Sequence, residues 1–224
     1  MTDILDAALD LKPSDAGDPN HVYELNPGVS KKWFKSSMRL ARIGVHGDGS
    51  CFYHSVCLAM NLEKYVSQND ATQKDIAYRL RCSLVDKLDA SMLKTILKKT
   101  NGKSPKTKED FRKSLCNPKI WADESAIRLF GETMDLNIIF LDMSKGELYC
   151  GVHHEDAMSK NLPDTLVVLW VNHSHFEPLS EILDVNDHVA KMRVLFHPSA
   201  SKEDDQLVRT LMSRYATQCK LRHV

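Results

Sequence analysis

The stretch from Gly47 to His54, which reads GDGSCFYH, constrains this chain more than any other. Gly47 and Gly49 can adopt positive φ and allow another chain to approach closely. The apolar run that follows predicts a helix from Cys51 to about Asn61, so the thiol lies in its first turn. Unpaired N–H groups and the helix dipole favour a nucleophilic thiolate there, and the same N–H groups could hold an oxyanion. The alternative is that Cys51 is a small buried hydrophobic residue, as free cysteines often are.

A histidine follows the second informative stretch. Residues 166–171 read LVVLWV, an apolar run typical of a buried strand, and His175 comes soon after its end. A cysteine followed much later by a histidine is the order found in papain-like cysteine hydrolases. We therefore predict that folding brings the His175 ring against the Cys51 sulfur. His173 is the rival for this role, whereas His54 is expected to be structural or at the surface.

Three sequence blocks in this order resemble the OTU (ovarian tumour) family of cysteine proteases. They are Asp48-Gly49-Ser50-Cys51-Phe52-Tyr53, Trp121-Ala122-Asp123-Glu124-Ser125-Ala126-Ile127 and His175-Phe176-Glu177-Pro178-Leu179. The resemblance extends from about Arg42 to Leu179. It implies a papain-like OTU fold of the α/β (α+β) class, in which helices flank a central, mostly antiparallel or mixed sheet.

The function that the resemblance implies is that of a cysteine-dependent deubiquitinase. Such an enzyme hydrolyses isopeptide bonds, and peptide bonds in some cases, at the C-terminus of ubiquitin or a ubiquitin-like modifier. The expected partners are ubiquitin, polyubiquitin chains or related modifiers, with no cofactor and with the chain acting as a monomer. One alternative is a non-catalytic ubiquitin-binding module with an OTU-like fold. Another is a cysteine hydrolase or acyltransferase that acts on small molecules.

The resemblance also assigns roles to residues. Cys51 would be the nucleophile and His175 the general base and acid, because the family's histidine also precedes an aromatic residue. Asp48 matches the family's aspartate three residues before the cysteine; it would orient the histidine, shape the oxyanion loop, or both, unless it only bonds its own turn. Many members have Asp or Asn two residues after the histidine, where this chain has Glu177, so Glu177 and Asn172 are the alternatives to Asp48. Oxyanion and substrate contacts are expected from Gly47, Gly49, Ser50 and Phe176.

Composition excludes several other classes of protein. The 224 residues include 30 Lys and Arg and 30 Asp and Glu, so the chain lacks the basic excess of nucleic-acid-binding proteins. No apolar run reaches the roughly 18 residues of a membrane helix, so no membrane association is expected. The six cysteines are scattered without a Cys-x-x-Cys pair and are expected to be reduced thiols. We therefore expect a cytoplasmic or nuclear location, or the host cytosol if the protein is viral or bacterial.

A metal site is not expected. The run His153-His154-Glu155-Asp156 and the separate His188 and His197 contain ligand types. Adjacent histidines on a polar loop usually face water, and no ligand spacing recurs in the chain.

We predict three regions: an N-terminal extension (1–39) that is partly helical, a catalytic domain (40–180), and a C-terminal extension (181–224) with an amphipathic helix. Trp121 is expected to pack beneath the site. Helices are predicted over 4–11, 31–40, 51–61, 72–88, 92–97, 109–116 and 121–134, and strands over 136–141, 147–151, 165–171 and 194–196.

Overall fold

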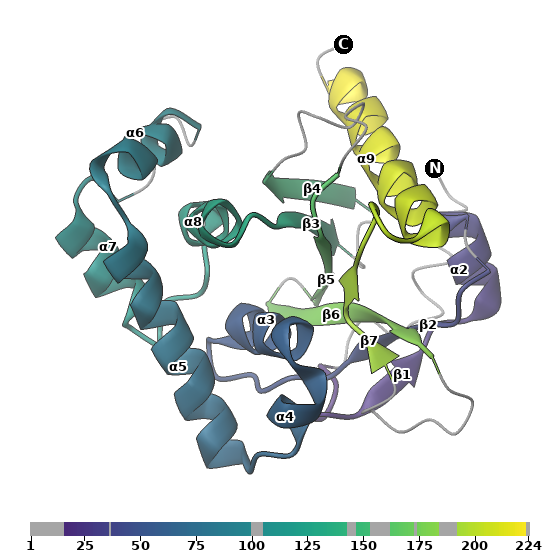
Figure 1. Cartoon of the computed structure of the whole chain (residues 1–224), viewed down its shortest axis with the longest axis horizontal. Helices are drawn as coiled ribbons and strands as arrows, with labels where there is room; N and C mark the ends of the chain where they lie inside the picture. The colour runs from purple at the N-terminus through teal and green to yellow at the C-terminus, as the bar shows by residue number, and fades with distance from the viewer. Residues whose placement is uncertain are drawn as a thin grey trace.

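A mixed β-sheet runs through the middle of the molecule, with helices on both of its faces (Figure 1). The structure is a computed structural model that describes residues 16–35, 37–99, 105–142, 147–152, 162–172, 174–183 and 192–222. Its helices are α2 (Pro27–Phe34), α3 (Cys51–Met60), α4 (Leu62–Val66), α5 (Asp70–Lys87), α6 (Ala90–Lys99), α7 (Lys108–Leu115), α8 (Glu124–Met134) and α9 (Lys202–Arg222). Its strands are β1 (Val22–Glu24), β2 (Leu40–Ile43), β3 (Asn137–Asp142), β4 (Glu147–Val152), β5 (Thr165–Val171), β6 (His175–Ile182), β7 (Met192–Arg193) and β8 (Leu195–Phe196).

The strand order in the sheet is β1-β2-β6-β5-β3-β4, with β7 paired to β6 and β8 paired to β5. Only β3 and β5 run parallel, and every other pair among the described strands is antiparallel. This architecture confirms the predicted α/β class with a mostly antiparallel, mixed sheet. Since β6 lies between β2 and β5, its first residue, His175, is held by the centre of the sheet.

Alternating side chains of the central strands build two separate cores. Ile138 and Phe140 of β3 point into the core shared with α3 to α8, whereas Ile139 and Leu141 point into the core shared with α2 and α9. Because both faces are covered, β3 and β5 are apolar almost throughout. Helix α3, which carries Cys51, lies on the first face together with α5 and α8 (Figure 1).

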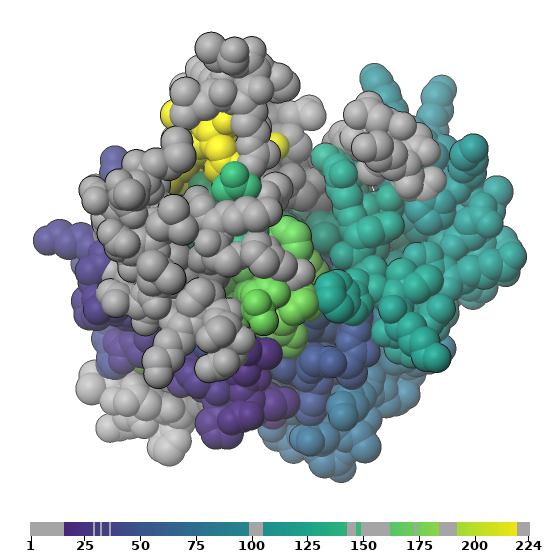
Figure 2. All heavy atoms as spheres, turned by 180° about the vertical axis from the view of Figure 1, so that it is seen from behind, coloured from purple at the N-terminus to yellow at the C-terminus, as the bar shows by residue number. Residues whose placement is uncertain are grey.

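The two ends of the described chain lie against this sheet. Helix α9 packs on the second face through Leu207, Val208, Leu211 and Met212. Seen from behind, the N-terminal residues around β1 adjoin the segment of β5 and β6, while α6 and α7 form a lobe at the side (Figure 2).

No helix in the described part of the chain is long and apolar enough to cross a membrane. The expected helix over 4–11 lies outside the described residues, and the three region boundaries stay a prediction.

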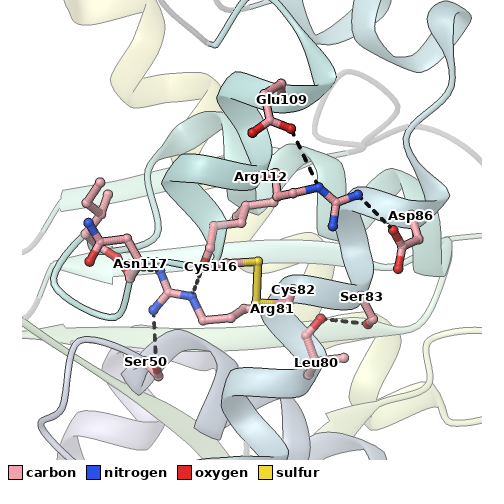
Figure 3. The surroundings of a disulfide bond; sticks show 12 residues. Ser50, Leu80, Arg81, Cys82, Ser83, Asp86, Glu109, Arg112, Cys116 and Asn117 are labelled. Carbon is pink, nitrogen blue, oxygen red and sulfur yellow. Dashed lines mark hydrogen bonds and ion pairs between the residues drawn. A yellow bond between two sulfur atoms is a disulfide. The ribbon is translucent and has the colours of Figure 1, made fainter.

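Two expectations about individual residues are wrong. Trp121 is 52% exposed and is therefore not buried beneath the site, although its Cδ1 would lie 3.7 Å from a Cβ added to Gly49. Cys82 on α5 and Cys116 after α7 form a disulfide with their Cα atoms 5.0 Å apart (Figure 3), so these two are not reduced thiols. The pairing follows from α5 and α7 lying side by side, and the separation of 34 residues in the sequence gives no sign of it. Cys51 and Cys57 are free.

Candidate active site

The loop from Gly47 to Ser50 delivers Cys51 to the first position of α3, as predicted. Gly49 has a φ of +82°, a conformation that favours glycine and that turns the chain into the helix. Ser50 is the N-cap residue, but its side chain makes no capping hydrogen bond to α3. Cys51 is buried, with 5% of its surface exposed, and the two glycines that we expected near the oxyanion lie in the loop before it.

Asp48 holds this loop from the inside. Its Oδ1 accepts a hydrogen bond from the Ser50 backbone N–H at 3.0 Å, and Nε2 of His54 lies 3.1 Å from the same oxygen. Burial raises the Asp48 pKa, but the hydrogen bonds and the charge of His54 outweigh it and leave the pKa below its ordinary value. His54 is fully buried, and its Nδ1 contacts the Tyr65 hydroxyl. Asp48 thus shapes the loop, and its described hydrogen bonds go to Ser50 and His54 and not to His175.

His175 is buried at the start of β6 and is incompletely paired. Its Nε2 has no hydrogen-bond partner, although it lies 3.5 Å from Oε1 of Glu177. Burial and, to a smaller extent, the positive charge of Arg42 lower the pKa of His175, against the opposing effect of the Val45 backbone carbonyl, and the net pKa is about 4. The imidazole is therefore neutral at pH 7. A buried polar atom without a partner at such a site calls for a functional explanation.

Glu177 supplies the carboxylate next to His175. His175 and Glu177 are two residues apart on β6, so their side chains lie on the same face of the sheet. The Glu177 carboxylate is fully buried; it accepts the Gly17 backbone N–H at 2.6 Å, and Nη1 of Arg42 lies 2.6 Å from Oε2. Burial raises the Glu177 pKa, and Arg42 and Gly17 counteract this shift. A side chain fixed by two other segments can hold a histidine ring in a defined orientation.

The Cys51 sulfur lies against the backbone of β6. The Phe176 N–H acts to lower the Cys51 pKa, and the Ser55 hydroxyl, one turn into α3, donates to the Cys51 carbonyl at 2.9 Å and to the Phe176 carbonyl at 3.4 Å. Burial is the strongest influence on the thiol and raises its pKa above the ordinary value. Folding therefore brings the nucleophile within one residue of His175, but no hydrogen bond joins His175 Nε2 to the sulfur.

The remaining candidates occupy different positions. Phe176 packs its ring 6.5 Å from that of Phe52, so it supports α3 from below. Asn172 is exposed just past β5 and has a φ of +49°. His173 and the run 153–156 lie outside the described residues, as does His188, whereas His197 pairs with Asp164 at 2.9 Å. No group of three or more metal-ligating side chains occurs within the described ranges.

Sequence reasoning missed three residues that hold the site. Gly17 and Arg42 fix Glu177, and Arg81 on α5 contacts Gly49 and Ser50. Gly17 and Arg81 lie outside every recognisable motif, and Arg42 lies at the edge of the resemblance. Arg42 belongs to an otherwise apolar strand, LARI, and a charge in such a strand is the one signal that could have identified it.

The fold and site define a protein with a cysteine at a helix N-terminus, beside a histidine at the start of a central strand. The OTU-like cysteine protease family matches residues 46–179, which is more than half of the chain. This protein belongs to that family.

One solved structure, of an OTU domain, agrees with this assignment at the level of the fold, and two others are reported beside it. A structure of an ovarian tumor (OTU) domain in complex with ubiquitin is 15% identical, covers 92% of this chain and 97% of its own, and has a TM-score of 0.52. The OTU domain of OTUD1 is 12% identical, with a TM-score of 0.45 over 80% of this chain and 97% of its own. The Hazara virus OTU bound to ubiquitin is 16% identical, with a TM-score of 0.37 over 65% of this chain and 83% of its own. The comparison with curated protein sequences found no significant match.

Proposed function

We propose that this protein is a thiol-dependent deubiquitinase, which hydrolyses the bond between the C-terminal glycine of ubiquitin, or of a ubiquitin-like modifier, and a lysine amine. The observation that carries the proposal is the placement of Cys51 at the start of α3, against the backbone of Phe176 in β6, one residue along that strand from the buried His175. Membership of the OTU-like cysteine protease family supports the reaction class. A related fold in complex with ubiquitin supports ubiquitin as the substrate.

In the proposed mechanism, His175 Nδ1, the ring nitrogen that does not face Glu177, takes the proton from the Cys51 thiol as the sulfur attacks the carbonyl carbon. The oxyanion that forms would be held by the Cys51 backbone N–H, one of the first amides of α3 and therefore without a partner inside the helix. The protonated histidine then delivers its proton to the lysine amine as the carbon–nitrogen bond breaks, leaving a thioester on Cys51. Water, activated by the neutral histidine, would hydrolyse the thioester.

The charges around the site favour a neutral resting pair over a thiolate–imidazolium pair. Burial raises the pKa of Cys51 and lowers that of His175 to about 4, so the proton stays on sulfur at pH 7. Proton transfer would then accompany the attack, once the His175 ring bonds the sulfur. Glu177 would orient the imidazole and stabilise its charged form through Nε2, because its Oε1 lies 3.5 Å from that nitrogen. Asp48 would hold the oxyanion loop through Ser50.

Incubation of the purified protein with a panel of di-ubiquitins tests this function. We expect cleavage of at least one linkage, loss of cleavage in Cys51→Ala, and labelling of Cys51 by ubiquitin with an electrophilic C-terminus. Cys57→Ala is the matched control for the mutagenesis, because Cys57 is also a free, buried cysteine and lies six residues further along α3. If no linkage is cleaved and no label attaches to the folded, reduced protein, the proposal is wrong.

A non-catalytic ubiquitin-binding module is the second candidate function. It is favoured by the raised Cys51 pKa together with the missing hydrogen bond between His175 and the sulfur. Calorimetric titration with ubiquitin distinguishes the two. Binding in the micromolar range by a reduced wild-type protein that cleaves nothing would establish the module.

A further inference from the structure

A buried arginine of α5 joins the cysteine loop (residues 47–50) to residues 115–120. Arg81 lies in the middle of α5, is 1% exposed, and is among the largest fully buried side chains of the described chain. A guanidinium has five N–H donors in a rigid plane, and each of its nitrogens finds an acceptor here. Nε donates to the Leu115 carbonyl, Nη1 to the Gly49 carbonyl at 3.2 Å and the Ser50 hydroxyl at 3.1 Å, and Nη2 to the carbonyls of Asn117 at 3.0 Å and Ile120 at 2.6 Å.

The acceptors of Arg81 are backbone carbonyls and one hydroxyl. Within the described residues, no carboxylate lies at ion-pair distance from its guanidinium, which stacks over the Tyr53 ring at 5.0 Å. A buried cation without a carboxylate partner is costly to a fold. Here the buried Arg81 side chain connects the cysteine loop to residues 115–120, and Figure 3 shows its bond to Ser50.

The peptide unit between Gly49 and Ser50 is held on both sides. Its carbonyl accepts from Arg81, and its N–H donates to Asp48. Because carbonyl and N–H point in opposite directions across a trans peptide, these two bonds fix the rotation of the plane. The next amide in the chain is that of Cys51, the proposed oxyanion donor, so its direction depends on this plane.

A second observation places the same segment against the loop. A Cβ added to Gly49 would lie 2.0 Å from the Pro118 carbonyl oxygen, so the backbones touch. The two segments are also joined covalently, because Cys82, the residue after Arg81, forms a disulfide with Cys116, the residue after the acceptor Leu115 (Figure 3). Residues 115–120 therefore pack against the cysteine loop, and Arg81 holds the two segments together.

We propose that Arg81 is a positioning residue, whose side chain fixes the cysteine loop against residues 115–120 and so aims the Cys51 amide at the developing oxyanion. This inference rests on the proposed function, and it names a residue outside the three blocks that resemble the family. Arg81 touches neither the substrate nor the reacting atoms in this scheme.

Replacement of Arg81 by lysine tests the role. Lysine keeps the charge but cannot bond the cysteine loop and residues 115–120 at the same time. We therefore expect kcat on a fluorogenic ubiquitin substrate to fall by about 10–100-fold, while KM changes less than about twofold. Arg79→Lys on the same helix is the matched control, because Arg79 is exposed and, within the described part of the chain, pairs only with Asp75. Ser50→Ala, which removes a single acceptor of Arg81, should give a smaller fall in kcat.

Amide hydrogen exchange of the peptide over residues 44–52 measures the loop directly. We expect at least about tenfold faster exchange in Arg81→Lys than in Arg79→Lys, with unchanged exchange in β5 and β3. Faster exchange throughout the molecule, or a loss of activity that only follows the folded fraction, would overturn the positioning role. If Arg81→Lys does not fold, Ser50→Ala decides by the same two measurements. A wild-type protein that cleaves no ubiquitin substrate refutes the proposed function, and the exchange measurement then decides whether Arg81 holds the loop.

Discussion

Cys51 and His175 are both buried, and burial moves their pKa values in opposite directions. The thiol pKa is raised above its ordinary value, and the imidazole pKa is lowered to about 4. A helix N-terminus alone favours the thiolate, as the sequence suggested, but at this position desolvation outweighs that effect. The first prediction concerns the form of the thiol in the free protein.

We expect the rate of Cys51 alkylation by iodoacetamide to rise about tenfold per pH unit from pH 6 to pH 9, because only the thiolate reacts and its fraction grows with pH. Mass spectrometry of the Cys51 peptide measures this rate. Cys57 is an internal control, since burial raises its pKa to about 12 and it should remain unlabelled over the same range. A rate that is already constant between pH 5 and pH 8 would indicate a thiolate–imidazolium pair and contradict the prediction.

Glu177 and Asp48 offer a second prediction at the scale of single residues. Glu177→Gln keeps the side chain's shape but removes the buried negative charge that faces Arg42 at 2.6 Å, so we expect the free energy of unfolding to fall by about 3–5 kcal/mol. Since the amide cannot stabilise an imidazolium, kcat should also fall, by about 10²-fold or more. Denaturant titration and fluorogenic ubiquitin hydrolysis measure the two effects.

Asp48→Asn is the comparison for Glu177→Gln. Its amide can still accept from Ser50, so we expect a smaller loss of kcat than in Glu177→Gln. This order is the reverse of the one that the sequence favours. A larger effect of Asp48→Asn would return the orienting role to Asp48.

At the scale of elements, the sequence predicted most helices and the apolar strands β3 and β5, because their periodicity and continuous apolar character leave few alternatives. It did not predict β6, although this strand carries His175. Pro178 lies in the middle of β6, paired with Val168 of β5, and proline normally argues against a central strand because it lacks an N–H donor. Burial on both faces of the sheet overrides that local signal.

The turn before α3 gives the third prediction. Gly49→Ala should destabilise the protein by about 2 kcal/mol or more, because φ of +82° is strained for alanine and the methyl group would meet the Pro118 oxygen at 2.0 Å. Gly47→Ala is the matched control for stability, since a Cβ there would meet nothing within 4 Å. Thermal unfolding of both variants measures the difference. Equal melting temperatures would show that the loop is not pressed against residues 115–120.

At the scale of the whole molecule, the parts of the site that the sequence could not predict are those formed by distant segments. Cys51 and His175 lie in recognisable blocks, but the bonds from Gly17 and Arg42 to Glu177 cross more than 130 residues of sequence. The same holds for the disulfide between Cys82 and Cys116, which depends on how α5 and α7 pack. Such contacts follow from tertiary geometry, and no local pattern encodes them.

The attachment of α9 to the sheet is the other long-range feature, and it gives the last prediction. Asp204, in the first turn of α9, is fully buried; it receives two bonds from Arg193 of β7, at 2.7 and 2.8 Å, and accepts the His197 backbone N–H at 2.6 Å. We expect Asp204→Asn to lower the free energy of unfolding by about 2–3 kcal/mol, because the amide cannot satisfy all three donors. Thermal unfolding should show a melting temperature lower by about 4–10 °C.

Asp205→Asn is the matched control for this change, because the two residues are neighbours in the same first turn and lose the same favourable contact with the helix dipole. Among the residues that the structure describes, Asp205 pairs only with Arg209, one turn along α9 at 2.8 Å, and both side chains are about one third exposed, so the cost should stay near 0.5 kcal/mol. The difference between the two variants therefore isolates the bonds from Asp204 to β7 and to His197. Equal destabilisation would mean that α9 is held to the sheet by its apolar face alone, through Leu207 and the residues one and two turns further along.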